Sequence, residues 1–599
     1  MKKEQEVKLI EYFNQALLGR EVDYAKLSEK AIKVGYLIHP ECATKAVEAF
    51  IDAQDIDYNS TFYKNWEDVL SKTRFELFLD QIRHYASTYG TNFQGEAWVP
   101  NDNNREVPEI TSMKVITPIT PSQLFEKCMG IAASGIALKS ETAQVIGEYI
   151  VEFDKLSGVD IDSIKNREIM TIVCDGLGTL PSEPFNLLRY IIYETTGDTM
   201  IIQNHELIIK IRQSLHPFDF GKLNEKQMKS LASIFLRYKN ILLAFKHPQF
   251  VNNNNNKYIN KLKRLSATYH KPIKENFWNT VLAKPINAYA YRQNEDTLTA
   301  FKAVGLIQAI NERLAGKGSV VIVRNGKLWY NTEEKNYSKL MIDYYEGLRV
   351  FLMDTLQKRL AEHKCIIRFP KELRLTLPAS EKTFFGNIPF GSSYQLIENN
   401  YVGIYWKSEW GTDDFDLHYA DMDGDTIGWN SSFVGNNITF SGDMTCAIPD
   451  AAEVFHIKKG IKDGLINVAR FRGDVNSKFI MFFGQGKLNS RCKGYMVDPN
   501  TIVAKAEMIS HKRDSLCGII QNNIITLCQL DISDNRVPNQ QKFLVDMMKT
   551  KARSFIPLKE VLLASGYTDY DTLTDEEKNT VEYIDLRELN KDSIINLMR

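Results

Sequence analysis

The sequence predicts a mixed α+β chain of several domains, with a helical first half, an α/β connector, an antiparallel β-sandwich and a helical tail. Three observations support this fold class. The 599 residues exceed what one hydrophobic core usually serves, because domains span about 100 to 200 residues. Before residue 298, apolar residues recur every three or four positions, as in amphipathic helices. From Cys365 to Val537, short β-rich runs alternate with Gly, Asn and Asp, as in a sandwich.

The helical region is expected to span residues 1–295, to be all-α and to comprise one or two subdomains. Its helical runs include KAVEAFIDA, TRFELFLDQIRHYAS, SQLFEKCMGIAAS, ETAQVIGEYIVEF and KSLASIFLRYKNILLAF. Turn-forming residues separate these runs, and the asparagine run Asn252–Asn256 is the best candidate for an internal linker.

The α/β connector is expected to span residues 296–390. It begins with the helical run FKAVGLIQAINERLA, and Asn325-Gly326 then lies between two β-rich runs. Because both residues of such a turn must accept positive φ, Asn-Gly predicts a β-hairpin. A long amphipathic helix from Tyr337 to His363 follows.

The β-sandwich is expected over residues 391–537 and the helical tail over residues 538–599. In the tail, Thr574 and Glu577 have the spacing of a capping box, which predicts the start of a helix. Because polar residues precede the tail, we expect the sandwich to stay folded without it. The alternative is that apolar tail residues dock on a sheet: Phe543, Leu544, Met547 and Met548.

Composition excludes several functional classes. Lys and Arg (74) nearly balance Asp and Glu (75), so the net charge of -1 creates no global field toward nucleic acid or an anionic membrane. The first residues lack the apolar core of a secretory signal, and the longest weakly polar stretch, Met129–Leu138, is too short to cross a bilayer. Eight cysteines without a CxxC pair indicate reduced thiols. We therefore expect a cytoplasmic protein with no membrane span.

The chain lacks the common catalytic motifs: HExxH, GxSxG, GxGxxG after a strand, and the phosphate-binding P-loop. His205 and His216 stand among apolar residues, where a lone histidine is usually structural or exposed. The sequence therefore favours a protein without enzymatic activity.

The richest polar cluster is the segment DDFDLHYADMDGDTIGW. Asp414 and Asp416 alternate with Phe415 and Leu417, so in a strand both carboxylates project from one face. Asp443, in FSGDMT, could approach them across the end of the sandwich. Carboxylate oxygens gathered in this way suggest a site for Ca²⁺ or Mg²⁺. The alternative is a tight turn, which also favours Asp and Gly.

One segment resembles the TerD-like domain of bacterial tellurium-resistance and general stress proteins: YVGIYWKSEWGTDDFDLHYADMDGDTIGWNSSFVGNNITFSGDMTCAIPDAAEVFHI, followed by GLINVARFRG. The resemblance covers residues 394–537, and Asp414, Asp416, Gly442 and Asp443 match the acidic motifs of that family. It implies a calcium-binding β-sandwich without established catalytic activity, fused to other modules. The implied function is a non-enzymatic cytosolic protein of stress response or tellurite resistance, whose helical part is a scaffold for an unidentified protein partner.

Departures from the family pattern weaken the implied metal site. His418 stands where the third acid is expected, and Met444 replaces an amide. The following loop keeps only Asp450 and Glu453, which are weaker candidate ligands. Because Ca²⁺ affinity depends on ligand charge and number, the sequence predicts that Ca²⁺ binding is weak or lost.

A second candidate site is the basic segment 257–274, which contains six Lys or Arg residues and no acid. Lys261, Lys263, Arg264 and Lys271 are its candidate anion contacts, and the interleaved aromatic residues could stack on bases. The alternative function is therefore a nucleic-acid-associated protein, for example of a mobile element or phage. A solvated helix face would explain the same residues.

Overall fold

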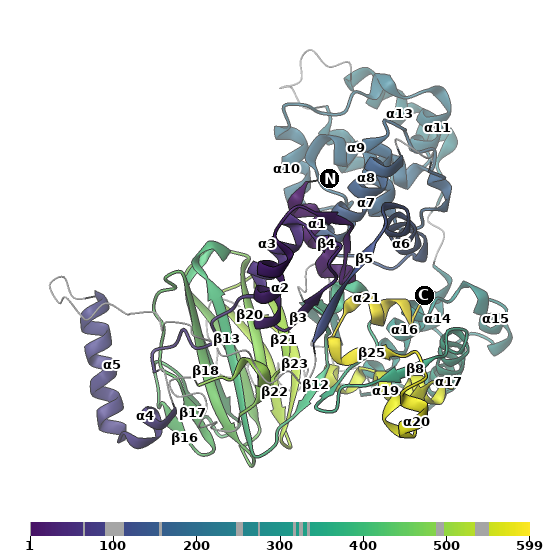
Figure 1. The fold of residues 1–599 in the computed structure, drawn as a ribbon. Helices are drawn as coiled ribbons and strands as arrows, with labels where there is room; N and C mark the ends of the chain where they lie inside the picture. The colour runs from purple at the N-terminus through teal and green to yellow at the C-terminus, as the bar shows by residue number, and fades with distance from the viewer. Residues whose placement is uncertain are drawn as a thin grey trace.

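The computed structural model describes residues 2–63, 66–89, 113–154, 159–246, 255–272, 276–315, 319–322, 328–331, 336–486, 496–532 and 550–599. The architecture is mixed α+β, as the sequence predicts (Figure 1). Two antiparallel sheets form one side of the molecule, a group of helices lies above, and further helices lie on the other side with the C-terminal segments. Within the described ranges, no helix combines the length and apolarity that crossing a bilayer requires.

The N-terminal part contains strands as well as helices. Its elements are α1 (Lys3–Phe13), β1 (Gln15–Leu17), β2 (Gly19–Arg20), α2 (Tyr24–Lys33), β3 (Tyr36–Ile38), β4 (Cys42–Ala43), α3 (Lys45–Gln54), α4 (Trp66–Ser71), α5 (Arg74–Tyr89) and β5 (Lys114–Ile119). Strand β5 pairs in parallel with β1 and β3, and β2 pairs in parallel with β4. The all-α prediction for residues 1–295 is therefore wrong. These strands have only two to six residues, too few to show a clear period of two in the sequence.

The upper group consists of helices. They are α6 (Pro121–Ser134), α7 (Ser140–Asp154), α8 (Arg167–Gly176), α9 (Pro184–Thr196), α10 (His205–Gln213), α11 (Glu225–Ala232), α12 (Lys239–Ala244) and α13 (Asn255–Tyr269). Thr120 and Gln123 form the capping box that starts α6. Asn255, expected in a linker, is instead buried in the fold: it accepts from the Phe220 N–H (3.0 Å) and donates to the Phe218 carbonyl (2.8 Å). Residues 252–254 of the expected linker lie outside the described residues.

The connector follows the predicted order. Helices α14 (Phe277–Ala283) and α15 (Ala288–Arg292) precede it, and its own elements include α16 (Ala300–Ala315), β6 (Ser319–Ile322), β7 (Leu328–Asn331), α17 (Lys339–Ala361) and β8 (Ile366–Arg368). Strands β6 and β7 pair antiparallel, and α17 is the predicted long helix. The predicted turn residues Asn325-Gly326 lie outside the described residues.

The tail is integrated into the fold. Its elements are α19 (Leu558–Ala564), β24 (Thr568–Asp569), α20 (Asp575–Lys578), β25 (Ile584–Asp585) and α21 (Lys591–Asn596). Thr574 starts α20 through the predicted capping box. Strands β24 and β25 pair in parallel with β8 from both sides, and the Leu558 N–H donates to the Leu375 carbonyl (2.9 Å). These contacts contradict the expectation of a separable appendage. The apolar docking candidates lie outside the described residues: Phe543, Leu544, Met547 and Met548.

Two antiparallel sheets form the two-sheet unit, which carries the candidate site. One sheet has the order β15 (Thr426–Ile427), β14 (Thr412–Asp421), β19 (Gly464–Gly473), β22 (Asp514–Gln521), β23 (Ile524–Ile532), β12 (Ser393–Gln395) and β9 (Leu373–Arg374). The other has the order β16 (Val434–Gly435), β17 (Ile438–Phe440), β18 (Asp450–Lys458), β13 (Asn399–Lys407), β20 (Ser477–Gln485) and β21 (Ile502–Ser510). Aromatic contacts join the sheets: the Phe415 ring of β14 lies 5.9 Å from Trp406 of β13 and 5.0 Å from Phe479 of β20. Burial of such large side chains holds the sheets face to face.

Candidate cation site

Strand β14 places two of the predicted acids on one face. Phe415 and Leu417 are fully buried between the sheets, and Asp414 and Asp416 occupy the alternate positions. The pairing of β14 with β19 shifts register around Asp414, as at a β-bulge, which changes the direction of nearby side chains. Asp414 and Asp416 are only 3% and 4% exposed, so both carboxyl groups lie inside the protein.

Asp443 joins these two acids from the loop between β17 and β18. The candidate ligand atoms of Asp414, Asp416 and Asp443 all lie within 4.8 Å of one another, and Asp443 is 4% exposed. The predicted convergence of the three acids is thus confirmed. Ca²⁺ binds oxygens at about 2.3 to 2.6 Å, so oxygens on opposite sides of one ion are about 5 Å apart. The spacing of the three carboxylates therefore fits a shared hard cation.

A fourth acid, Glu453 of β18, lies beside the cluster and is fully buried. Its Oε2 accepts from the Leu417 N–H (2.6 Å) and its Oε1 accepts from the Met444 N–H (3.0 Å). Burial is the main cause that raises the pKa of Glu453 well above its ordinary value, and the nearby Asp443 and Asp416 carboxyl groups raise it further. Glu453 therefore links β14 to the Asp443 loop, and its raised pKa reflects both its burial and the carboxyl groups gathered beside it.

Asp450, the other weaker candidate, lies outside the three-acid cluster. Its Oδ2 accepts from the Tyr405 hydroxyl (2.9 Å). His418 also lies on β14, and the Gly428 backbone packs so close to its ring that a Cβ there would lie 2.5 Å from Nδ1. Met444, which follows Asp443, donates its backbone N–H to Glu453.

The acids in DMDGD form a turn. The Asp421 Oδ1 accepts from the backbone N–H groups of Asp423 (2.9 Å) and Asp425 (2.8 Å), as in an Asx-turn. Lys462 Nζ lies 3.2 Å from Asp421 and 2.9 Å from Asp423. The turn interpretation therefore accounts for these acids, and they lie outside the cation cluster.

A segment that the sequence did not mark also contacts the site. We call residues Asn59–Tyr63 the strap; they follow α3 and run against the two-sheet unit. The Tyr63 N–H donates to the Ser441 carbonyl (3.0 Å), two residues before Asp443, and the Ala452 N–H donates to the Ser60 carbonyl (2.8 Å). The strap thus lies on the loop that carries Asp443.

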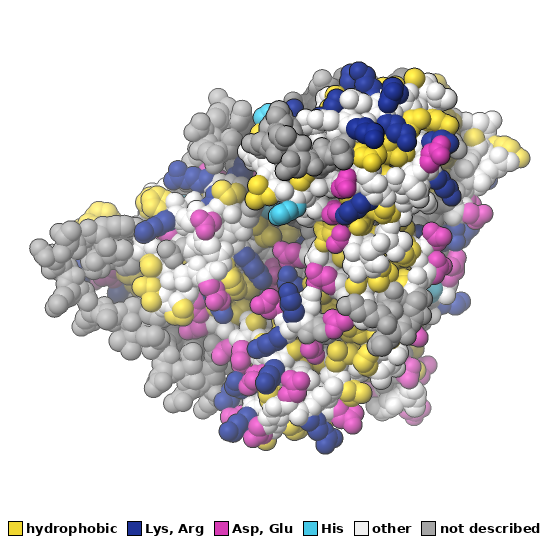
Figure 2. Space-filling view, turned by 90° about the horizontal axis from the view of Figure 1, so that it is seen from above, with side chains coloured by type: hydrophobic (Ala, Val, Ile, Leu, Met, Phe, Trp, Pro, Cys, Tyr) yellow, Lys and Arg dark blue, Asp and Glu magenta, His cyan; other side chains and the backbone are white. Residues whose placement is uncertain are grey.

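The basic residues of the second candidate site lie on the upper helices. Lys261, Lys263 and Arg264 are exposed on α13, whereas Leu262 between them is fully buried in the core of these helices. Lys271 follows α13 and is also exposed. Figure 2 views the molecule from the side of these helices and shows Lys and Arg side chains gathered on that face. The arrangement suits contact with an anion, and it equally suits a solvated helix face.

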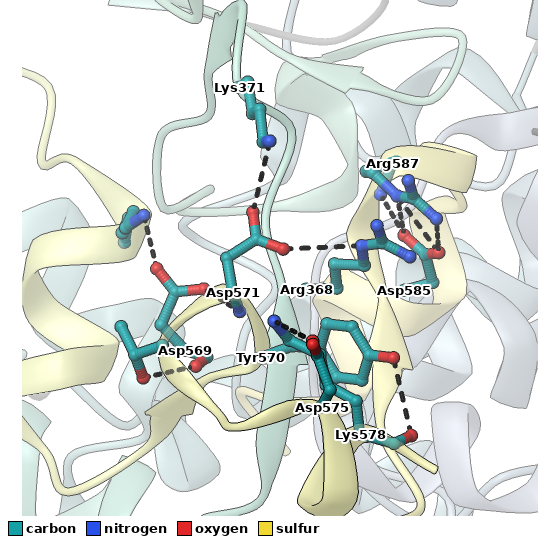
Figure 3. A network of polar contacts seen from close by, with 11 residues as sticks. Arg368, Lys371, Asp569, Tyr570, Asp571, Asp575, Lys578, Asp585 and Arg587 are labelled. Carbon is teal, nitrogen blue, oxygen red and sulfur yellow. Dashed lines mark hydrogen bonds and ion pairs between the residues drawn. The ribbon is translucent and has the colours of Figure 1, made fainter. Parts of the chain in front are cut away.

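A cavity of about 370 Å³ lies where the tail meets the connector, next to β8 and β9. Its charged residues are already paired: Lys559 with Asp569 (2.6 Å) and Arg374 with Glu560 (2.6 Å). Figure 3 shows the adjoining network, in which Asp571 lies between Lys371 and Arg368 and Arg587 binds Asp585. The pairs of Asp571 with Arg368 and Lys371 join the tail segment after β24 to β8 and the residues that follow it, so the network has a structural role.

Comparisons with family models, with curated proteins and with solved structures give no match. The geometry of the site is therefore the structural basis for a function.

Proposed function

We propose that this chain is a non-enzymatic protein of the stress-response or tellurite-resistance type, whose TerD-like two-sheet unit binds Ca²⁺ at Asp414, Asp416 and Asp443. The convergence of these three buried carboxylates carries the proposal. The TerD-like assignment is supported by the place of the DFDLH segment on β14 of one sheet and of Gly442-Asp443 on the loop leading to β18 of the other.

The electrostatics favour a cation. Moving a carboxylate out of water costs several kcal/mol unless it is paired with a positive charge or protonated, and here three carboxylates and Glu453 share one small buried region. Ca²⁺ supplies the opposite charge and prefers the oxygen ligands that these residues offer. Because only three carboxylates lie in the cluster and both Glu453 oxygens accept backbone N–H groups, we expect binding to be weak relative to sites with more acidic ligands.

Titration calorimetry with Ca²⁺ tests this proposal. We expect one Ca²⁺ ion per chain, and we expect Asp414→Asn and Asp443→Asn each to abolish the binding heat. Asp423→Asn is the matched control, because it removes the same carboxylate charge from the exposed turn bound to Lys462. If the wild-type chain shows no heat at millimolar Ca²⁺, or if all three variants bind equally, the proposal is wrong.

A second candidate function is nucleic-acid binding by the upper helices. Residues 159–272 contain sixteen Lys and Arg against ten Asp and Glu, a formal charge of +6 in a chain whose total is -1. None of the ion pairs among the described residues involves the four candidate side chains, Lys261, Lys263, Arg264 and Lys271. Local positive charge of this kind suits a phosphate backbone.

A further inference from the structure

The strap, Asn59–Tyr63, lies along the loop that carries Asp443. Its hydrogen bonds flank this acid in the sequence: the Tyr63 N–H donates to the Ser441 carbonyl (3.0 Å) at the start of the loop, and the Ser60 carbonyl accepts from the Ala452 N–H (2.8 Å) of β18, just after the loop. Ser60 and Ser441 are fully buried. The strap therefore pairs with the backbone of the cation-site loop from inside the protein.

Phe62 of the strap packs directly against the residue that precedes Asp443. Gly442 has φ +93°, and a Cβ at this position would lie 2.7 Å from the Phe62 ring. Only glycine allows both this backbone conformation and this close approach. The position of the Phe62 ring is thus linked to the conformation of the backbone that orients Asp443.

The strap has its own anchor on the two-sheet unit. The Asn59 Oδ1 accepts from the Met496 and Val497 N–H groups (2.8 Å each), and its Nδ2 donates to the Val497 carbonyl (2.9 Å). The Trp66 Nε1 donates to the Met496 carbonyl (3.0 Å) just beyond the strap. These bonds hold the strap independently of the Asp443 loop, so the strap can hold that loop in place.

We propose that the strap is the positioning element of the cation site, and that Ca²⁺ binding and strap docking are coupled. The inference rests on the proposed function. Asp414 and Asp416 are fixed by the pairing of β14 with β19, whereas Asp443 lies on a connecting loop that contacts the strap. Coupling is reciprocal: if the docked strap favours the cation, the cation favours the docked strap by the same factor. The N-terminal part of the chain thereby senses the state of the two-sheet unit.

Hydrogen exchange on the wild-type chain tests the coupling without altering the strap. The amides of Tyr63 and Ala452 report docking, because each forms a hydrogen bond between the strap and the sheet unit. We expect Ca²⁺, relative to a chelator, to slow exchange of these two amides about 5-fold or more. The effect should vanish in Asp414→Asn. Unchanged exchange in a chain that binds Ca²⁺ overturns the coupling and leaves the proposed function intact.

Calorimetry on a strap variant tests the same coupling from the other side. Phe62→Ala should weaken Ca²⁺ binding about 5-fold or more. Phe75→Ala is the matched control, because Phe75 is on α5 and is 67% exposed. This variant should bind Ca²⁺ with the affinity of the wild-type chain. Equal affinity in a folded Phe62→Ala chain overturns the inference. Absence of Ca²⁺ binding by the wild-type chain overturns the proposed function and this inference together.

Discussion

Glu381 joins three parts of the molecule, and its substitution should be among the most destabilising single changes in the chain. This glutamate is fully buried. Its Oε1 accepts from the Lys591 ammonium of α21 (2.9 Å) and from the Thr142 hydroxyl of α7 (3.2 Å), and its Oε2 accepts from the Lys139 N–H. One carboxylate thus connects the connector, the upper helices and the tail.

The expected loss of stability follows from the burial of both charges, those of Glu381 and Lys591. Glu381→Gln keeps the shape of the side chain but leaves the Lys591 ammonium, 13% exposed, without its counter-charge. Removing one partner of a buried pair costs about 3 to 5 kcal/mol, whereas replacing both partners with apolar groups is often nearly neutral. We therefore expect Glu381→Gln to lower the free energy of unfolding by about 3 kcal/mol. Adding Lys591→Met should restore at least about 1 kcal/mol.

Urea unfolding followed by circular dichroism at pH 7 measures these differences. Glu225→Gln is the control, since its partner Lys229 (2.8 Å) is on the same exposed helix face and exposed pairs of this kind contribute little to stability. If Glu381→Gln lowers the free energy of unfolding no more than Glu225→Gln does, the buried ion pair does not have the predicted role. The absence of any restoration in the double variant would lead to the same conclusion.

The contribution of Glu381 should also depend on pH. Burial alone would raise the pKa of Glu381, but the Lys591 and Lys139 ammonium groups bring it below its ordinary value of 4.5. A carboxyl group whose pKa is lower in the folded chain stabilises that chain above the unfolded pKa. The stability difference between wild type and Glu381→Gln should therefore be complete near neutral pH and should shrink as pH falls below about 4.5.

Two further predictions concern the basic residues and the tail. If Lys261, Lys263 and Arg264 bind nucleic acid, changing them to Glu should flatten the log-log salt dependence of oligonucleotide binding by about 0.7 to 0.9 per lost phosphate contact; absence of binding by the wild-type chain at low salt contradicts this function. Removing residues 550–599 should yield insoluble protein or loss of cooperative urea unfolding, because β8 loses both neighbouring strands; a soluble truncated chain with a cooperative transition contradicts this.

Local patterns in the sequence were sufficient for part of the site. Alternation along a strand placed Asp414 and Asp416 on one face, because the side-chain period of a strand is two. Asp443 was expected near them only as an acid that could approach across the end of the sandwich and as a match to the TerD-like motif, since the path of a loop between strands has no sequence period. The sequence did not indicate which of Glu453 and Asp450 lies beside the cluster. The two acids are three residues apart, but only Glu453 accepts a hydrogen bond from the Leu417 N–H.

Long-range contacts account for what the sequence did not predict. The strap depends on Asn59 binding Val497, residues 438 positions apart, and such a contact leaves no local pattern. Similarly, Gln15 of β1 is aligned with Thr117 of β5 across about a hundred residues of chain, so two short strands looked like irregular segments of a helical region. The hairpin of β6 and β7 was predictable because its partners are adjacent in the sequence.

The pairing of β8 has a consequence for biosynthesis. Ile367 is aligned with Asp569 on one side and with Ile584 on the other, roughly 200 residues later in the chain. At about 5 to 20 residues per second, a ribosome needs about 10 to 40 s to make that interval. During this interval β24 and β25, which pair with both edges of β8, have not yet been translated. Unpaired strand edges are templates for aggregation. We therefore expect both edges of β8 to stay unpaired on the nascent chain until the tail has been synthesised.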